Sequence, residues 1–162
     1  MENMNELIAA IETMDPEAIA SAILVFTGLF VSIAAVALIR YLMISIGYAK
    51  MFRKAGVAGW KAFIPVYNSY NEYKISWTGK IYFLALALNI ATSALAKSTN
   101  FVLSLIAAAA GIALIVIAVK QNIKMAKAFG KGAGTGILLI LFPGITSLVL
   151  GFGKAEYTAI AE

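Results

Sequence analysis

Four lysines in the second half of the chain have the spacing of one helical face. Lys124, Lys127 and Lys131 follow Lys120 at +4, +7 and +11. At 100° per residue, all three fall within about 40° of Lys120. An ammonium group beside an anionic membrane surface contributes about 1 kcal/mol of binding. The stripe therefore predicts either a site for anionic lipid headgroups or a set of charges that only orients the chain in a membrane.

Other residue types that commonly carry chemistry are scarce. The chain has no Cys and no His, which excludes thiolate nucleophiles, disulfides and zinc sites with the usual ligands. Glu72 is the only acid between residues 55 and 77, and Asn89 is the only amide in the middle of an apolar stretch. For Asn89 we expect a hydrogen bond between helices, with a place in a transport site as the alternative. The sequence predicts no cofactor, no metal site and no catalytic group.

The elements that must position these residues are apolar helices. The 162 residues are 62% hydrophobic and 13% charged, against about 25% charged in an ordinary soluble domain. A helix of about 20 residues crosses a hydrocarbon layer about 30 Å thick. Four uncharged stretches have this length or nearly so: residues 18–39, 81–96, 98–119 and 132–153. The sequence therefore predicts an all-α fold, an integral membrane four-helix bundle.

The expected bundle has two parts. Residues 1–15 are predicted to form an extracytoplasmic amphipathic helix on the membrane surface, and residues 16–162 a four-span membrane domain. Asp15 and Pro16 are typical of an N-cap and a first helical residue. The four spans are expected at about residues 16–49, 77–96, 98–120 and 132–153, with the first helix continuing to about Lys54. Arg40 is expected either at the inner interface or inside the bundle.

An aromatic segment separates the first two spans. Trp and Tyr favour the headgroup level of a membrane, and Pro65 prevents a regular helix from running through the segment. We expect a structured cytoplasmic elbow on the membrane surface, to which Trp60, Pro65 and Tyr67 contribute. Asn68 is expected to cap or hydrogen-bond the turn that follows Pro65.

Glycine and proline mark the fourth span. The run Phe129–Gly136 reads FGKGAGTG, but its lysine is not followed by Ser or Thr, as a phosphate-binding P-loop requires. It predicts a tight turn and close helix packing instead. Pro143 and Gly144 are expected to kink the span and to free a carbonyl that a neighbouring group must satisfy.

Basic residues lie on alternate sides of the expected spans. Seven of the 13 lie between the first two uncharged stretches and four follow the third, and only Lys97 and Lys154 fall on the other side. Because basic loops stay in the cytoplasm, we expect both termini outside and both basic loops inside. The net charge of +5 then reflects orientation and attraction to anionic lipid, and no nucleic-acid partner is expected.

Three short blocks carry a family resemblance. The run from Lys54 to Asn68 reads KAGVAGWKAFIPVYN, residues 126–131 read AKAFGK, and residues 151–157 read GFGKAEY. Together they resemble DUF5684, an uncharacterised family of small polytopic prokaryotic membrane proteins. The resemblance implies a multi-pass protein of the prokaryotic cytoplasmic membrane and no established activity. Its elbow positions in this chain are Lys54, Gly56, Gly59, Trp60, Pro65, Tyr67 and Asn68.

Three classes of function are compatible with these features. The first is a non-catalytic membrane scaffold or accessory protein that binds anionic phospholipid on its cytoplasmic face and a membrane protein partner or further copies of itself. The second is a small oligomeric transporter or channel for a neutral solute or a lipid. The third is a membrane enzyme, for which the elbow offers only Glu72 as an acid. We expect the first.

Overall fold

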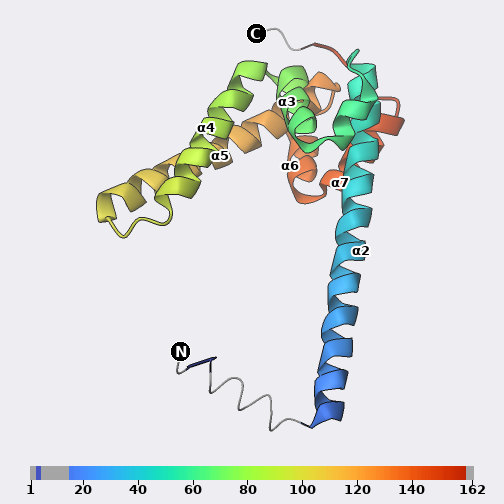
Figure 1. Cartoon of the computed structure of the whole chain (residues 1–162). Coiled ribbons are helices and arrows are strands. Elements are labelled where there is room, and N and C mark those ends of the chain that lie inside the picture. Colours follow the sequence, from blue (N-terminus) through green and yellow to red (C-terminus); the bar gives the residue numbers. More distant parts are fainter. Residues whose placement is uncertain (1–2, 5–14, 160–162) are drawn as a thin grey trace. The chain divides into compact units, whose positions relative to one another are not determined.

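The computed structural model describes residues 3–4 and 15–159, and helices make up most of this part of the chain. They are α2 (Pro16–Lys54), η1 (Gly59–Phe63), α3 (Pro65–Ser76), α4 (Gly79–Leu95), α5 (Phe101–Ala128), α6 (Ala133–Leu141) and α7 (Pro143–Phe152) (Figure 1). The described residues contain no strand, so the expected all-α fold is confirmed. The expected amphipathic helix lies almost wholly outside the described residues.

The chain divides into two compact units, residues 1–40 and residues 41–162. The first contains the N-terminal part of α2, where the Asp15 carboxylate accepts a hydrogen bond from the Glu17 amide at 3.2 Å. Pro16 is the first residue of the helix, so the predicted start of α2 is confirmed. Among the described helices, α2 and α5 are long and apolar enough to cross a membrane.

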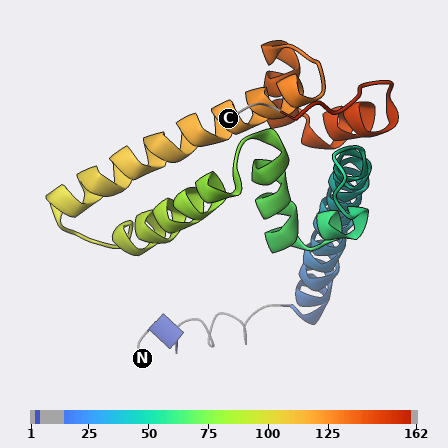
Figure 2. The same ribbon diagram turned by 90° about the horizontal axis from the view of Figure 1, so that it is seen from above.

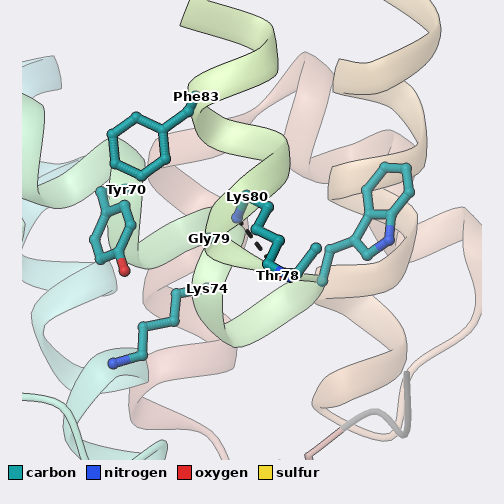
Figure 3. Close-up of a pocket in the computed structure, with 7 residues that line it drawn as sticks. Tyr70, Lys74, Thr78, Gly79, Lys80 and Phe83 are labelled. Carbon is teal, nitrogen blue, oxygen red and sulfur yellow. Dashed lines mark hydrogen bonds between the residues drawn. The ribbon is translucent and has the colours of Figure 1, made fainter.

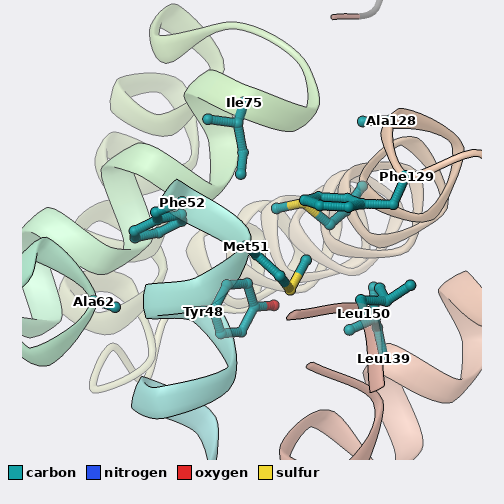
Figure 4. Close-up of a cluster of buried hydrophobic side chains, with 10 residues drawn as sticks. Tyr48, Met51, Phe52, Ala62, Ile75, Ala128, Phe129, Leu139 and Leu150 are labelled. Atoms are coloured by element: carbon teal, nitrogen blue, oxygen red, sulfur yellow. The ribbon is translucent and has the colours of Figure 1, made fainter. Parts of the chain in front are cut away.

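The second unit has its core around the C-terminal end of α2. Met51, Phe52 and Met125 are fully buried there, and Figure 4 shows side chains from α2, α3, α5, α6 and α7 meeting around them. The core comprises Tyr48, Met51, Phe52, Ala62, Ile75, Met125, Ala128, Phe129, Leu139 and Leu150. Burial of apolar side chains at this one point joins segments that are about 100 residues apart in sequence, such as those of Met51 and Leu150.

Helix α5 is the longest element that lies wholly in this unit. It packs against α3, α4 and α6, and it runs side by side with α4 (Figures 1 and 2). The Asn100 side chain caps α5 by accepting hydrogen bonds from the amides of Val102 and Leu103. The second and third expected spans therefore correspond to α4 and α5.

The fourth expected span is not one continuous helix. Its residues form α6 and α7, of 9 and 10 residues, which meet at Phe142. Pro143 begins α7 and has no N–H to continue the ladder of α6. The Thr146 hydroxyl donates to the Leu138 carbonyl at 3.0 Å, and the same carbonyl accepts the Phe142 amide at 2.8 Å. This bond therefore joins the start of α7 to the end of α6, and it does not fill the Leu139 carbonyl, whose helical donor Pro143 lacks. The expected kink is thus a full break.

The segment before α6 and the segment after α7 lie in contact with each other. The Thr158 amide donates to the Ala128 carbonyl at 2.7 Å, and the Phe129 and Tyr157 rings lie 5.6 Å apart. Residues just before α6 therefore contact residues just after α7. The segment is a helical hairpin (defined here as residues 133–152), so it does not supply one continuous fourth helix for the expected four-helix bundle.

Glycines let the hairpin approach its neighbours closely. A Cβ atom on Gly136 of α6 would lie 2.7 Å from the Ile123 Cα atom of α5. A Cβ on Gly47 of α2 would lie 2.6 Å from the Ser147 backbone, and one on Gly151 of α7 would lie 2.6 Å from the Gly47 carbonyl oxygen. Real Cβ atoms do not approach so closely, so the expected close packing at the glycine-rich run is confirmed at Gly136.

Adding a methyl group at Gly136 should destabilise the protein. The nearest atoms are backbone atoms of α5, which cannot move aside, so G136A is expected to lower the free energy of unfolding by about 1–3 kcal/mol. The control is G111A, because nothing lies within 4 Å of a Cβ there and alanine favours helix by up to about 1 kcal/mol. Denaturant unfolding in detergent, followed by circular dichroism, measures both. Equal stability of the two variants would contradict the close α5–α6 contact.

Candidate functional site: a basic, aromatic-lined pocket at the elbow

Lys54 connects the end of α2 to the end of the hairpin. Its ammonium group donates hydrogen bonds to the carbonyl oxygens of Leu150, Gly153 and Ala155, each at 2.8 Å. The last carbonyls of a helix have no partner within the helix, and a cation there also interacts favourably with the helix dipole. An ammonium group has three donors, so Lys54 is fully satisfied by α7 and the segment that follows it.

Tyr157 fixes the same segment to the elbow. Its hydroxyl donates to the Ile75 carbonyl at 3.0 Å, at the end of α3. Burial raises the pKa of the Tyr157 phenol above its usual value of 10.0, which further favours the neutral form that donates this bond. Residues 151–157, the third block of the family resemblance, therefore have a structural role. Lys54 holds this segment to the end of α2, and Tyr157 holds it to the end of α3.

The elbow is structured, as expected, but one of its residues has another role. Pro65 is the first residue of α3, and the Trp60 and Tyr67 rings meet edge-on at 5.7 Å. The Asn68 side chain does not cap the turn: its Oδ1 atom is buried without a hydrogen-bond partner among the described residues. The amide that does bond to this helix is Asn71, whose Nδ2 donates to the Tyr67 carbonyl at 2.6 Å.

The two elbow glycines have different functions. Gly56 has a φ angle of +73°, a conformation that favours glycine and turns the chain at the end of α2. A Cβ on Gly59 would lie 2.9 Å from the Ala49 carbonyl oxygen. The first glycine therefore supplies a turn and the second a close contact.

A basic pocket forms where α3 turns into α4. It has a volume of about 370 Å³ and is lined by Tyr70, Lys74, Trp77, Thr78, Gly79, Lys80 and Phe83 (Figure 3). We refer to it as the headgroup pocket. The Thr78 hydroxyl accepts a hydrogen bond from the Lys80 amide at 3.4 Å and caps α4. Two ammonium groups, aromatic walls and a helix N-terminus with its partial positive charge thus surround one opening.

The predicted lysine stripe is only partly present. Lys120, Lys124 and Lys127 lie on α5, but α5 ends at Ala128 and Gly130 turns the chain with a φ angle of +66°. The helical spacing therefore does not extend to Lys131, which lines a separate cavity of about 530 Å³ in the hairpin. None of the four lines the headgroup pocket, but the Lys124 Nζ lies 4.3 Å from the centre of the Trp77 ring, which forms part of its wall.

Asn89 lies on α4 with its side chain exposed. It makes no hydrogen bond with the residues that the structure describes, so the interhelical bond expected within this chain is not present.

The sequence reasoning did not single out Lys74 and Lys80. The signal that could have found them is the sequence KISWTGK, in which lysines flank a Thr-Gly helix start.

The described residues contain no group of three or more His, Cys, Asp or Glu that could hold a metal ion.

A family model described as "Family of unknown function (DUF5684)" matches residues 60–159, which include the headgroup pocket and the hairpin. No curated protein and no solved structure matches the chain. The site must therefore be interpreted from its own geometry.

Replacing Lys54 should loosen the end of the hairpin. K54M removes three charge-assisted hydrogen bonds, and we expect a loss of about 2–4 kcal/mol in the free energy of unfolding. Hydrogen exchange of the amides in residues 150–158 should become faster. The matched control is K50M, one turn earlier on α2, where Nζ only lies over the Phe152 ring at 4.9 Å. That contact is worth about 1 kcal/mol or less. Equal effects of the two substitutions would contradict the assigned role of Lys54.

Proposed function

Since the chain belongs to a family of unknown function (DUF5684), we propose a function from its own geometry: a non-catalytic scaffold or accessory protein of the prokaryotic cytoplasmic membrane that binds anionic lipid headgroups. The observation that carries the proposal is the headgroup pocket. Lys74 and Lys80 line it together, and Lys124 lies against its Trp77 wall. The two ammonium groups of the lining attract a phosphate, and the aromatic rings suit the boundary between headgroups and acyl chains.

The proposal includes a revised topology. We propose that α2, α4 and α5 cross the membrane and that the hairpin enters and leaves on the inner side. The hydrogen bonds of Lys54 and Thr158 support this arrangement, because they hold the chain after α7 beside the elbow and the end of α5. The C-terminus is then inside rather than outside. Lys154 joins the inner residues, so 12 of the 13 basic residues lie inside and only Lys97 outside, which fits the positive-inside rule better than the four-span arrangement.

The topology can be tested by cysteine labelling, because the native chain has no Cys. We expect S98C to react with a membrane-impermeant maleimide in intact cells, since this residue lies in the short connection between α4 and α5. T158C should react only after the cells are opened. S69C, at an exposed position of α3, is the control for an inner residue. Labelling of T158C in intact cells, with S69C unlabelled, would restore the outside C-terminus.

The lipid site can be tested by two pairs of substitutions with equal charge. K74Q/K80Q removes both lysines of the headgroup pocket, whereas K120Q/K127Q removes two exposed lysines of α5. At about 1 kcal/mol per lysine, we expect the pocket pair to weaken retention of phosphatidylglycerol over phosphatidylcholine by about 5- to 30-fold. The α5 pair should have a smaller effect. Native mass spectrometry of protein released from mixed-lipid nanodiscs at two salt concentrations measures the preference.

Each result of this comparison has a defined meaning. Equal losses from the two pairs would make lipid preference a matter of total charge and would contradict the pocket. Unchanged preference in both variants would contradict headgroup binding itself. Binding of the native protein should also weaken as salt increases, since exposed charges are screened over about 8–10 Å at 0.1–0.15 M.

A further inference from the structure

A second cavity lies between α3 and the helices α2, α5, α6 and α7, and the proposed function does not use it. Its volume is about 470 Å³, within the usual range for small-molecule sites. It is lined by Ile44 and Tyr48 of α2, Glu72 of α3, Ile115, Ala118, Val119 and Asn122 of α5, Leu139 and Ile140 of α6, and Pro143 of α7. Aliphatic side chains form most of its wall, and only Tyr48, Glu72 and Asn122 are polar.

Glu72 has no cationic partner in this cavity. No ion pair joins it to a lysine or arginine among the described residues, and neither α5, α6 nor α7 contributes a titratable side chain to the lining. The other titratable side chain in the lining is Tyr48 from α2, and Tyr73 is the next residue after Glu72 on α3. Burial raises the pKa of Glu72 from 4.5 to about 8. The pKa of Tyr73 is raised by its own burial and then by the charge of Glu72.

An unpaired carboxyl group in an apolar cavity is costly when ionised. It can remain protonated, or it can ionise against a cation that enters the cavity. A bare divalent metal ion does not fit, because Ca²⁺ and Mg²⁺ require about six oxygen ligands and the cavity offers one carboxylate with an amide and a phenol. An organic cation needs only one counter-ion, and its apolar part suits the aliphatic wall.

We propose that this cavity binds a small organic cation with an apolar body, and that Glu72 is the counter-ion for its charged group. The Tyr48 ring lines the cavity and can contact the cation. The Asn122 Nδ2 already donates to the Ala118 carbonyl, which leaves its Oδ1 as a polar contact that can orient the ligand. The cation replaces the proton on Glu72, so one proton leaves the protein for each cation bound. This site is independent of the headgroup pocket and of the proposed lipid binding.

The pH dependence follows from that exchange. With a pKa of about 8, only about 1% of Glu72 is ionised at pH 6 and most of it at pH 9, so affinity for a permanently charged ligand should rise roughly 100-fold between these values. Without ligand, the folded protein holds this proton up to about pH 8 while the unfolded chain releases it near 4.5. Stability should therefore fall as pH rises through this window, and E72Q should remove that fall.

The probe is benzyltrimethylammonium, whose charge does not titrate, and the control ligand is its uncharged carbon isostere, neopentylbenzene. Calorimetry uses the full chain in phosphatidylcholine nanodiscs, which carry no anionic lipid, with protein-free nanodiscs to subtract partitioning. We expect the cation to bind at least 10-fold more tightly than the isostere, with release of a proton. We expect E72Q to abolish the difference between the two ligands and the pH dependence.

A second variant keeps the test decisive if E72Q folds poorly. A118F keeps the carboxylate but fills the cavity from α5, where Ala118 lines it, and should block binding of the cation while elution volume and helix content stay unchanged. Equal binding of the cation and the isostere would make the cavity a site for hydrocarbon, such as an acyl chain, and would overturn the proposal. Unchanged cation binding in E72Q or in folded A118F would also overturn it. None of these outcomes alters retention of phosphatidylglycerol at the headgroup pocket.

Discussion

The contact of the Lys54 ammonium with three carbonyl oxygens is the interaction on which the rest of the second unit depends. Each bond is 2.8 Å long, and all three donors of the side chain are used. Charge-assisted bonds of this kind are stronger than neutral ones, and an unpaired ammonium in an apolar setting would be far less favourable. The end of α2 therefore fixes where α7 must end, and with it the position of residues 153–158.

The hairpin follows from this constraint together with the glycines. If α7 ends beside Lys54 and α6 begins just after α5, a helix of 20 residues cannot connect the two points. The chain must reverse, and Pro143 supplies the break. Gly136 then lets α6 lie directly on α5, and Gly47 and Gly151 let α7 lie directly on α2. Dispersion and close packing, rather than a difference in polarity, hold such helices together in an apolar environment.

Sequence reasoning predicts what depends on local signals and misses what depends on distant contacts. The Asp15–Pro16 start of α2, its extension to Lys54 and the turn at Gly130 are all encoded within a few residues. Hydropathy cannot distinguish one apolar helix from two short ones of the same composition, so it does not predict that residues 132–153 form α6 and α7. The stripe failed at Lys131 because the helical period holds only to Ala128. The partners of Lys54 and the cavity around Glu72 come from segments far apart in the chain, which no local pattern reveals.

The geometry of α3 explains how a carboxyl group stays unpaired beside so many lysines. Tyr70, Lys74 and Trp77 are spaced by four and three residues, so they share one helical face and line the headgroup pocket. Glu72 is two residues from Lys74, about 200° away around the helix, and it faces the other cavity. The helix therefore separates a cationic exterior from an acidic interior. Salt screens the exposed lysines more strongly than the partly buried Glu72. An anion and a cation can thus bind on opposite sides of one short helix, with different dependence on salt and pH.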